Sequence, residues 1–102
     1  MKRVFISQPM RGLSADQIVR ARAAAMARVG EVLEEPFLVI DSILEGPEND
    51  IWYLGESIKR MADADVVYFA TGWQRAKGCL VEFNVAGLYG LKMIVEPERE
   101  RR

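Results

Sequence analysis

The chain has no histidine and only one cysteine, Cys79, among its 102 residues. The lack of histidine excludes Ser-His-Asp and Cys-His catalytic arrangements, and it removes a common ligand of zinc sites. A lone cysteine excludes a disulfide within the chain and indicates a reducing compartment. Any catalysis must therefore use carboxylates, hydroxyls, amides, lysine, arginine or the single thiol.

Long apolar runs and an excess of either charge are also missing. The opening MKRVFISQPM has too short an apolar run for a signal peptide, and no segment approaches the length of a membrane span. Fourteen basic residues face fifteen acidic ones, whereas a nucleic-acid surface normally shows a basic excess. We therefore expect a cytoplasmic protein that binds neither a membrane nor a nucleic-acid polymer.

What is present is the composition of one small globular domain. Half of the residues are hydrophobic and 28% are charged, which is typical of folded chains. We assign residues 1–96 to a single domain and the charged residues 97–102 to a solvated tail. The net charge of −1 lowers repulsion between copies, which favours self-association.

Short apolar runs alternate with helical patterns along the chain. The expected strands are residues 3–7, 37–40, 65–70 and 91–96. Ser14 with Gln17 three residues later forms a capping box, which predicts a long helix from there to Pro36. A second helix is expected from Asn49 or Asp50 to residue 61 or 62, and a third within residues 76–90.

This alternation predicts a three-layer α/β sandwich, flavodoxin- or Rossmann-like, with a mostly parallel sheet. Near-continuous apolar strands indicate a sheet covered on both faces. We predict the strand order 2-1-3-4, with a fifth strand only if residues 42–48 add one. In such sheets, ligands bind beyond the carboxyl ends of the strands at the switch point, here between the first and third strands. The loops at this point are SQPMRG (7–12) and ATGWQRAKG (70–78).

The third helix carries one charge in its body, Glu82, among apolar neighbours such as Leu80 and Phe83. Burying an unpaired carboxylate is costly, so such a group is usually neutralised, paired or used. A carboxylate near a helix N-terminus is favoured by the free N–H groups, and Arg75 or Lys77 could pair with it. The residues alone therefore leave two interpretations open, a structural carboxylate and a ligand-facing one.

Three segments, RVFISQPMRG, SIKRMADADVVYF and KGCLVEFNVAGLYGLKMIV, together resemble the nucleoside 2-deoxyribosyltransferase superfamily. This superfamily includes the 2'-deoxynucleoside 5'-phosphate N-hydrolases, and the chain is most similar to its compact phage and bacterial branch. The resemblance spans residues 3 to 95. It implies cleavage or transfer at the N-glycosidic bond of a nucleoside or nucleoside 5'-monophosphate, without metal or other cofactor. It also implies a homodimer or larger homo-oligomer whose sites are lined partly by a neighbour.

By this resemblance, Glu82 is the nucleophile that attacks C1' of the sugar. A carboxylate there stabilises an oxocarbenium-like transition state and can trap the sugar covalently. The superfamily's first-strand tyrosine falls on Phe5, which has no hydroxyl, and its helix aspartate falls on Ser57, a very weak acid. We take Glu82 and Ser57 as candidate catalytic residues, with Asp41 as a substitute acid. The alternative is a non-catalytic nucleotide-binding or sensing protein on the same fold.

The two loops and the start of the third helix supply candidate substrate-binding residues. The resemblance implies that Arg11 contacts a 5'-phosphate, although Arg11 could instead be a solvated surface residue. An exposed Trp73 would stack on a nucleobase or contact a second copy. Cys79 sits where a thiol pKa can be depressed, and we expect it to contact the ligand rather than attack it. The complete set is Phe5, Ser7, Gln8, Met10, Arg11, Gly12, Trp73, Gly78 and Cys79. The face carrying Arg20, Arg22, Arg28 and Glu31 is expected to be solvated.

Overall fold

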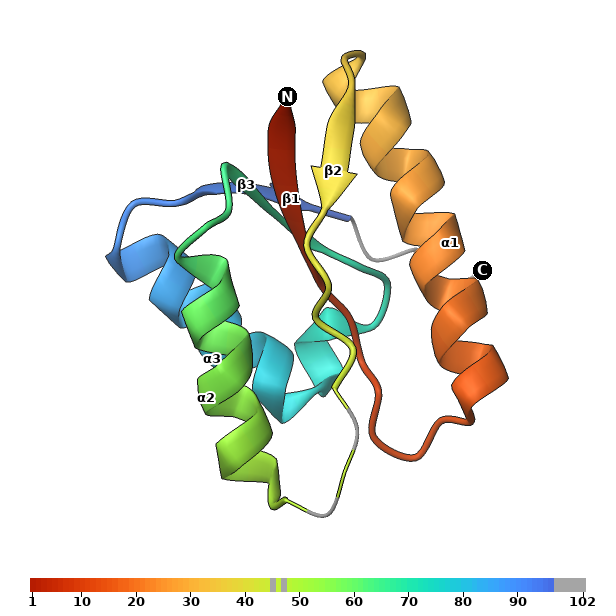
Figure 1. Ribbon diagram of the computed structural model, residues 1–102, viewed down its shortest axis with the longest axis vertical. Coiled ribbons are helices and arrows are strands. Elements are labelled where there is room, and N and C mark those ends of the chain that lie inside the picture. The colour runs from red at the N-terminus through yellow and green to blue at the C-terminus, as the bar shows by residue number, and fades with distance from the viewer. Residues whose placement is uncertain (45, 47, 97–102) are drawn as a thin grey trace, which may run out of the picture.

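A computed structural model describes residues 1–44, 46 and 48–96, so the predicted tail 97–102 lies outside the described residues (Figure 1). Along the chain the elements are β1 (Lys2–Ser7), α1 (Ala15–Leu33), β2 (Phe37–Val39), α2 (Asp50–Met61), β3 (Val66–Phe69), a 3-10 turn η1 (Trp73–Arg75), α3 (Lys77–Leu88) and β4 (Lys92–Val95). Within this part of the chain, no helix is both long and apolar enough to cross a bilayer.

The strands form one four-stranded parallel sheet in the order β2-β1-β3-β4. Helix α1 covers one face of the sheet, and α2 and α3 cover the other (Figure 1). The predicted three-layer α/β sandwich and its strand order are therefore confirmed. No fifth strand is present among the described residues of the segment 42–48.

Alternation along the buried strands divides the core into two clusters. Val4 and Ile6 of β1 pack on the α1 side, whereas Phe5 packs on the side of α2 and α3. Successive side chains of a strand point to opposite faces. Ser7, the last residue of β1, therefore falls on the same side as Phe5, facing α3.

The helix ends follow the polar residues that precede them. Ser14 Oγ accepts the Gln17 N–H at 3.1 Å while Gln17 Oε1 accepts the Ser14 N–H at 2.8 Å, so the predicted capping box is confirmed. Asn49 caps α2 in the same way. Helix α3 has no side-chain cap, and it begins at Lys77, one residue before Gly78. Its first turn thus keeps free N–H groups at the carboxyl edge of the sheet.

The basic side chains of α1 are not all solvated, contrary to expectation. Arg22 is half-buried and donates to the Ile40 carbonyl at 2.7 Å, while Arg28 pairs with Glu96. Both side chains are long enough to reach from the helix to the ends of neighbouring strands. The prediction made from helical position was therefore wrong for the side chains of Arg22 and Arg28.

Candidate functional site

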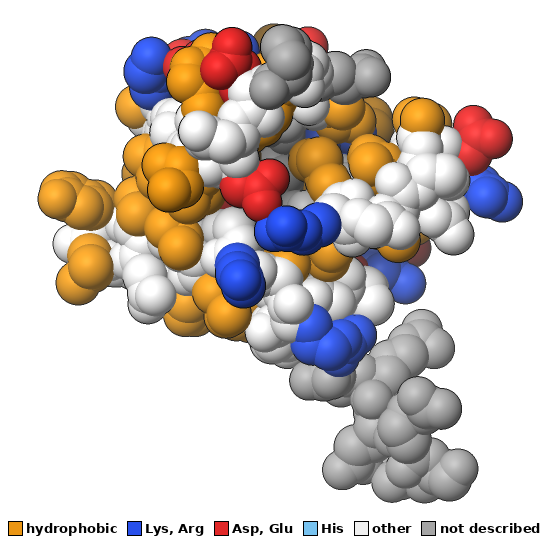
Figure 2. Space-filling model, turned by 90° about the horizontal axis from the view of Figure 1, so that it is seen from below, with side chains coloured by type: hydrophobic (Ala, Val, Ile, Leu, Met, Phe, Trp, Pro, Cys, Tyr) orange, Lys and Arg blue, Asp and Glu red, His pale blue; other side chains and the backbone are white. Residues whose placement is uncertain are grey.

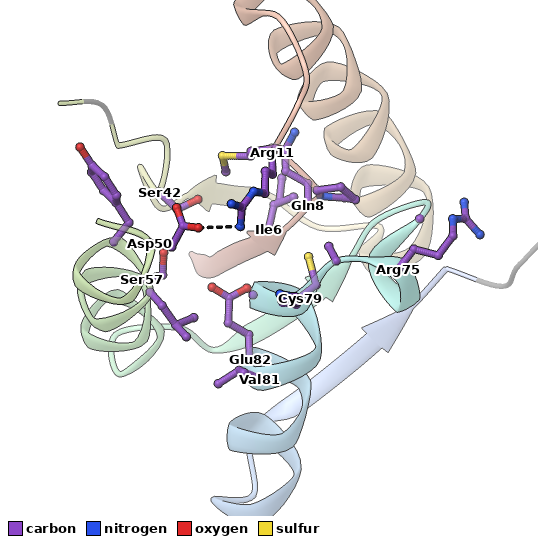
Figure 3. A pocket seen from close by; sticks show the side chains of 18 of the residues that line it. Ile6, Gln8, Arg11, Ser42, Asp50, Ser57, Arg75, Cys79, Val81 and Glu82 are labelled. Atoms are coloured by element: carbon purple, nitrogen blue, oxygen red, sulfur yellow. Dashed lines mark hydrogen bonds and ion pairs between the residues drawn. The ribbon is translucent and has the colours of Figure 1, made fainter. Parts of the chain in front are cut away.

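A cavity of about 900 Å³ opens at the carboxyl edge of the sheet, at the predicted switch point between β1 and β3 (Figure 3). The loop after β1, the first turns of α2 and the first two turns of α3 surround it. The loop follows β1, α2 begins after the loop that follows β2, and α3 begins after the loop that follows β3. Because these three strands are neighbours in the sheet, the strand order brings the three segments together.

Glu82 lies in the second turn of α3 and lines this cavity with only 7% of its surface exposed. The Ser7 hydroxyl donates to its Oε1 at 2.6 Å, and Ser57 on α2 supplies a second hydrogen bond. Burial raises the pKa of Glu82 to about 7, and the two hydroxyl contacts oppose that rise. The hydroxyls of Ser7 and Ser57 thus hold the carboxylate at the cavity wall.

An ion pair crosses the mouth of the cavity. Arg11 Nη1, in the loop after β1, lies 2.6 Å from Asp50 Oδ2 at the start of α2 (Figure 3). The two side chains are 82% and 75% exposed, and such pairs contribute only about 0–1 kcal/mol. Lys77 also lines the opening, and Figure 2 shows basic and acidic side chains gathered beside the hollow. An anionic group could therefore replace Asp50 beside Arg11 at little cost.

Most of the predicted site residues meet in this cavity. Besides Glu82 and Ser57, the lining includes Phe5, Gln8, Met10, Arg11, Gly78 and Cys79. Ser7 takes part through its bond to Glu82. Asp41 is exposed, lies outside the lining and accepts the Ile43 N–H, so it is not placed to act as a substitute acid.

Besides Ser7, two predicted binding residues, Trp73 and Gly12, lie outside the cavity lining. Trp73 is only 8% exposed and stacks on Phe83, with ring centroids 4.6 Å apart. The turn η1 folds the indole into the core, so neither of its expected surface roles is available to it. Gly12 adopts a φ of +80° in an exposed turn that the Leu13 N–H closes on the Met10 carbonyl. It shapes the loop that presents Arg11.

Cys79 lines the cavity, but its thiol is not activated. The thiol pKa is raised to about 11, chiefly by burial; a hydrogen bond with Ser7 opposes the rise, and the charge of Glu82 adds to it. Desolvation therefore outweighs the helix N-terminus, which can depress a thiol pKa at such a position. A protonated thiol fits the expected contact role rather than nucleophilic attack.

Sequence reasoning missed Ser42 and Asp50, which also line the cavity. Ser42 comes soon after β2, at the same edge as the other loops, so its distance from the strand end was a usable signal. Asp50 was expected only at the start of the second helix, because its position beside the cavity depends on the path of the loop before α2. Among residues 1–44, 46 and 48–96, no group of three or more His, Cys, Asp or Glu gathers as a metal-ligand set.

Comparison with known families adds one finding. The family model described as a domain of unknown function, DUF4406, matches residues 2–95. The chain belongs to this family. The match spans all strands and helices of the DUF4406 domain, including every segment that lines the cavity. No curated protein and no solved structure matches the chain.

Proposed function

We propose that the DUF4406 domain cleaves or transfers at the N-glycosidic bond of a nucleoside or nucleoside 5'-monophosphate. The observation that carries this proposal is Glu82, a buried carboxylate with a raised pKa that two hydroxyls hold at a cavity wall. Perturbed carboxylates in clefts are candidate functional groups. Near pH 7 both protonation states of Glu82 are populated, so an ionised nucleophile is available.

In the proposed reaction, a Glu82 carboxylate oxygen attacks the anomeric carbon while the bond from that carbon to the base nitrogen breaks. The electron pair of that bond leaves with the base, which takes a proton from solvent. Water or a second base then attacks the same carbon and releases the carboxylate. The poorly solvated site strengthens the attraction between the carboxylate and the developing positive charge.

The resemblance implies a first-strand tyrosine whose hydroxyl holds the carboxylate of the nucleophile, and this chain has Phe5 at that position. Phe5 offers no hydroxyl, but Ser7, two residues later on the same side of β1, donates to the carboxylate at 2.6 Å. Ser57 contacts the carboxylate from α2. Two serines thus supply the positioning that the resemblance assigns to a tyrosine hydroxyl.

The absence of a strong acid at Ser57 favours a second candidate function, a nucleotide-binding or sensing protein without turnover. A serine hydroxyl is a poor proton donor to a leaving base, and losing general acid catalysis costs roughly 10²–10⁴-fold in rate. The enzyme remains our first proposal for substrates whose base leaves readily. We further propose that Arg11 binds a 5'-phosphate, that the protein is cytoplasmic and that it forms a homodimer.

Incubation with nucleosides and 5'-monophosphates, with and without an acceptor base, tests the function. We expect the wild-type protein to release free base, measured by chromatography. Glu82→Gln should reduce release by at least about 10³-fold, because it removes the nucleophile but keeps the side-chain shape.

The matched control is Glu56→Gln on α2, whose carboxylate pairs with Lys59 and Arg60 rather than lining the cavity. This variant should keep the wild-type rate. Wild-type binding without release would favour the non-catalytic alternative, and full turnover by Glu82→Gln would contradict the assignment of the nucleophile.

A further inference from the structure

The Asp50 carboxylate pairs with the guanidinium to which the proposed function assigns a 5'-phosphate. Its Oδ2 lies 2.6 Å from Arg11 Nη1, and both residues line the cavity that Glu82 also lines (Figure 3). A carboxylate and a phosphate present the same kind of anionic oxygen to a guanidinium. In the absence of a ligand, Arg11 is therefore paired with an anion that belongs to the chain itself.

Both partners can leave this ion pair at little cost. Their side chains are 82% and 75% exposed, so water solvates each charge as soon as the two separate. Asp50 is the first residue of α2, and the free N–H groups of the helix N-terminus stabilise a carboxylate there. A phosphate that reaches Arg11 can thus displace Asp50 without leaving a buried charge unpaired.

We propose that Asp50 is a specificity-determining residue, which competes with the 5'-phosphate for Arg11 and so limits the preference for nucleotides over nucleosides. A nucleoside carries no anion to exchange with Asp50, so it binds with the ion pair intact. This inference rests on the proposed function, because it takes the ligand to be a nucleoside or its 5'-monophosphate.

The charges around the cavity single out Asp50 for this role. Among the described residues that line the cavity, Asp50 and Glu82 are the only acidic ones. Glu82 is buried and accepts hydrogen bonds from Ser7 and Ser57, so it does not compete for Arg11 at the mouth.

The Asp50 carboxylate also disfavours a bound phosphate by repulsion. After it leaves Arg11 it remains on α2 beside the same mouth, and like charges within a few ångströms repel each other even in salt. Competition and repulsion act in the same direction, so removing the charge of Asp50 strengthens phosphate binding. A carboxylate that only held the loop in place would weaken phosphate binding when removed.

The test measures binding of the common 2'-deoxynucleosides and their 5'-monophosphates by calorimetry in a Glu82→Gln parent, so that no turnover interferes. We expect Asp50→Asn to bind the monophosphates about three- to tenfold more tightly than the parent does. Binding of the nucleosides should stay within about twofold of the parent. With Arg11→Met present, Asp50→Asn should strengthen monophosphate binding by at most about twofold, because only repulsion is then left to relieve.

Glu48→Gln is the matched control, because Glu48 is an exposed carboxylate two residues before Asp50 that does not line the cavity. It should leave both affinities unchanged. Arg20→Met is the control for the double variant, since Arg20 lies on α1 and contacts the Asp16 carbonyl of its own helix. With Arg20→Met present, Asp50→Asn should keep its full effect.

The outcomes separate this inference from the proposed function. If Asp50→Asn leaves monophosphate binding unchanged or weakens it, or strengthens nucleoside binding equally, the role of Asp50 is overturned while the nucleotide site stands. An equal gain in Glu48→Gln would replace competition at Arg11 by a general effect of charge and would also overturn it. Absence of binding of every nucleoside and monophosphate to the parent would overturn the proposed function as well.

Discussion

At the scale of single residues, ionisation of Glu82 lowers the stability of the fold but is required by the proposed reaction. Burial raises its folded-state pKa to about 7, above the ordinary value of 4.5. A carboxyl whose pKa is raised by folding binds its proton more tightly in the folded state than in the unfolded state. The folded state therefore loses stability as the pH rises from about 4.5 to about 7, and the loss stays constant above that range. The ionised form that the proposed reaction needs is the form that the fold disfavours.

Glu82→Gln is expected to stabilise the fold at pH 8. The amide carries no charge to bury and can still accept the hydroxyl bonds of Ser7 and Ser57. From the raised pKa we expect a gain of roughly 1–3 kcal/mol in the free energy of unfolding at pH 8, shrinking to near zero at pH 4. Urea denaturation of both proteins at the two pH values measures the difference.

Glu56→Gln serves as the control, because its expected change in the free energy of unfolding at pH 8 has the opposite sign. Contacts with Lys59 and Arg60 lower the pKa of Glu56, so its contribution to stability is present at neutral pH and is lost as the pH falls. This variant should therefore be less stable than wild type at pH 8, not more. If Glu82→Gln were also destabilising at pH 8, the carboxylate would not be held in the unfavourable, buried state described above.

At the scale of elements, the ion pair of Arg11 and Asp50 joins the loop after β1 to α2 across the cavity. We expect Arg11→Met to change the free energy of unfolding by less than about 1 kcal/mol, because the pair is highly exposed. The same variant should weaken binding of a 5'-monophosphate about tenfold and leave binding of the matching nucleoside nearly unchanged. Calorimetric titration with the two ligands separates these effects.

Arg20→Met again provides an exposed arginine away from the cavity as the control. Equal weakening of nucleoside and monophosphate in Arg11→Met would mean that Arg11 shapes the mouth rather than binding a phosphate. An unchanged affinity for both would remove Arg11 from the binding residues altogether.

The elements themselves were largely predictable, because their signals are local. The capping box marked the start of α1, and buried apolar runs marked the strands and their order. The burial of Trp73 was not predictable, since the direction of the indole depends on η1, a three-residue turn without hydrophobic periodicity. Arg22 was misjudged for a related reason. Whether a long basic side chain meets water or a strand end is decided by the packing of α1 on the sheet.

At the scale of the whole molecule, the segments that form the site were predictable, but the protonation and hydrogen-bond partners of their side chains were not. Strand order alone brings the loops after β1 and β3 together beside the start of α3, which explains why Glu82, Gln8 and Arg11 meet. The raised pKa of the Cys79 thiol and the hydrogen bonds of Arg22 to Gln8 and Ser42 depend on burial and on how α1 packs against the strand ends. Those properties exist only once the three layers are assembled.

The outer surface of α2 and α3 exposes several large apolar side chains. Ile51, Trp52, Leu80 and Leu88 are between 41% and 82% exposed, and hydrophobic side chains gather on this side of the molecule (Figure 2). A helix that is apolar on all sides is normally buried, and α3 has Glu82 as its only acidic residue. Ile51 also lines the cavity, so the apolar surface is continuous with the mouth of the site.

We therefore expect a homodimer that buries this surface. Light scattering after size exclusion should give about twice the 11.5 kDa mass of the chain. Leu88→Glu should shift the protein to monomer, because it places a charge in the buried interface. Val32→Glu, on the exposed side of α1, is the control and should leave the dimer intact. A wild-type monomer at 100 µM protein would contradict the dimer. A dimer broken by Val32→Glu but not by Leu88→Glu would move the interface to α1, where a second copy would lie on the other face of the sheet from Glu82.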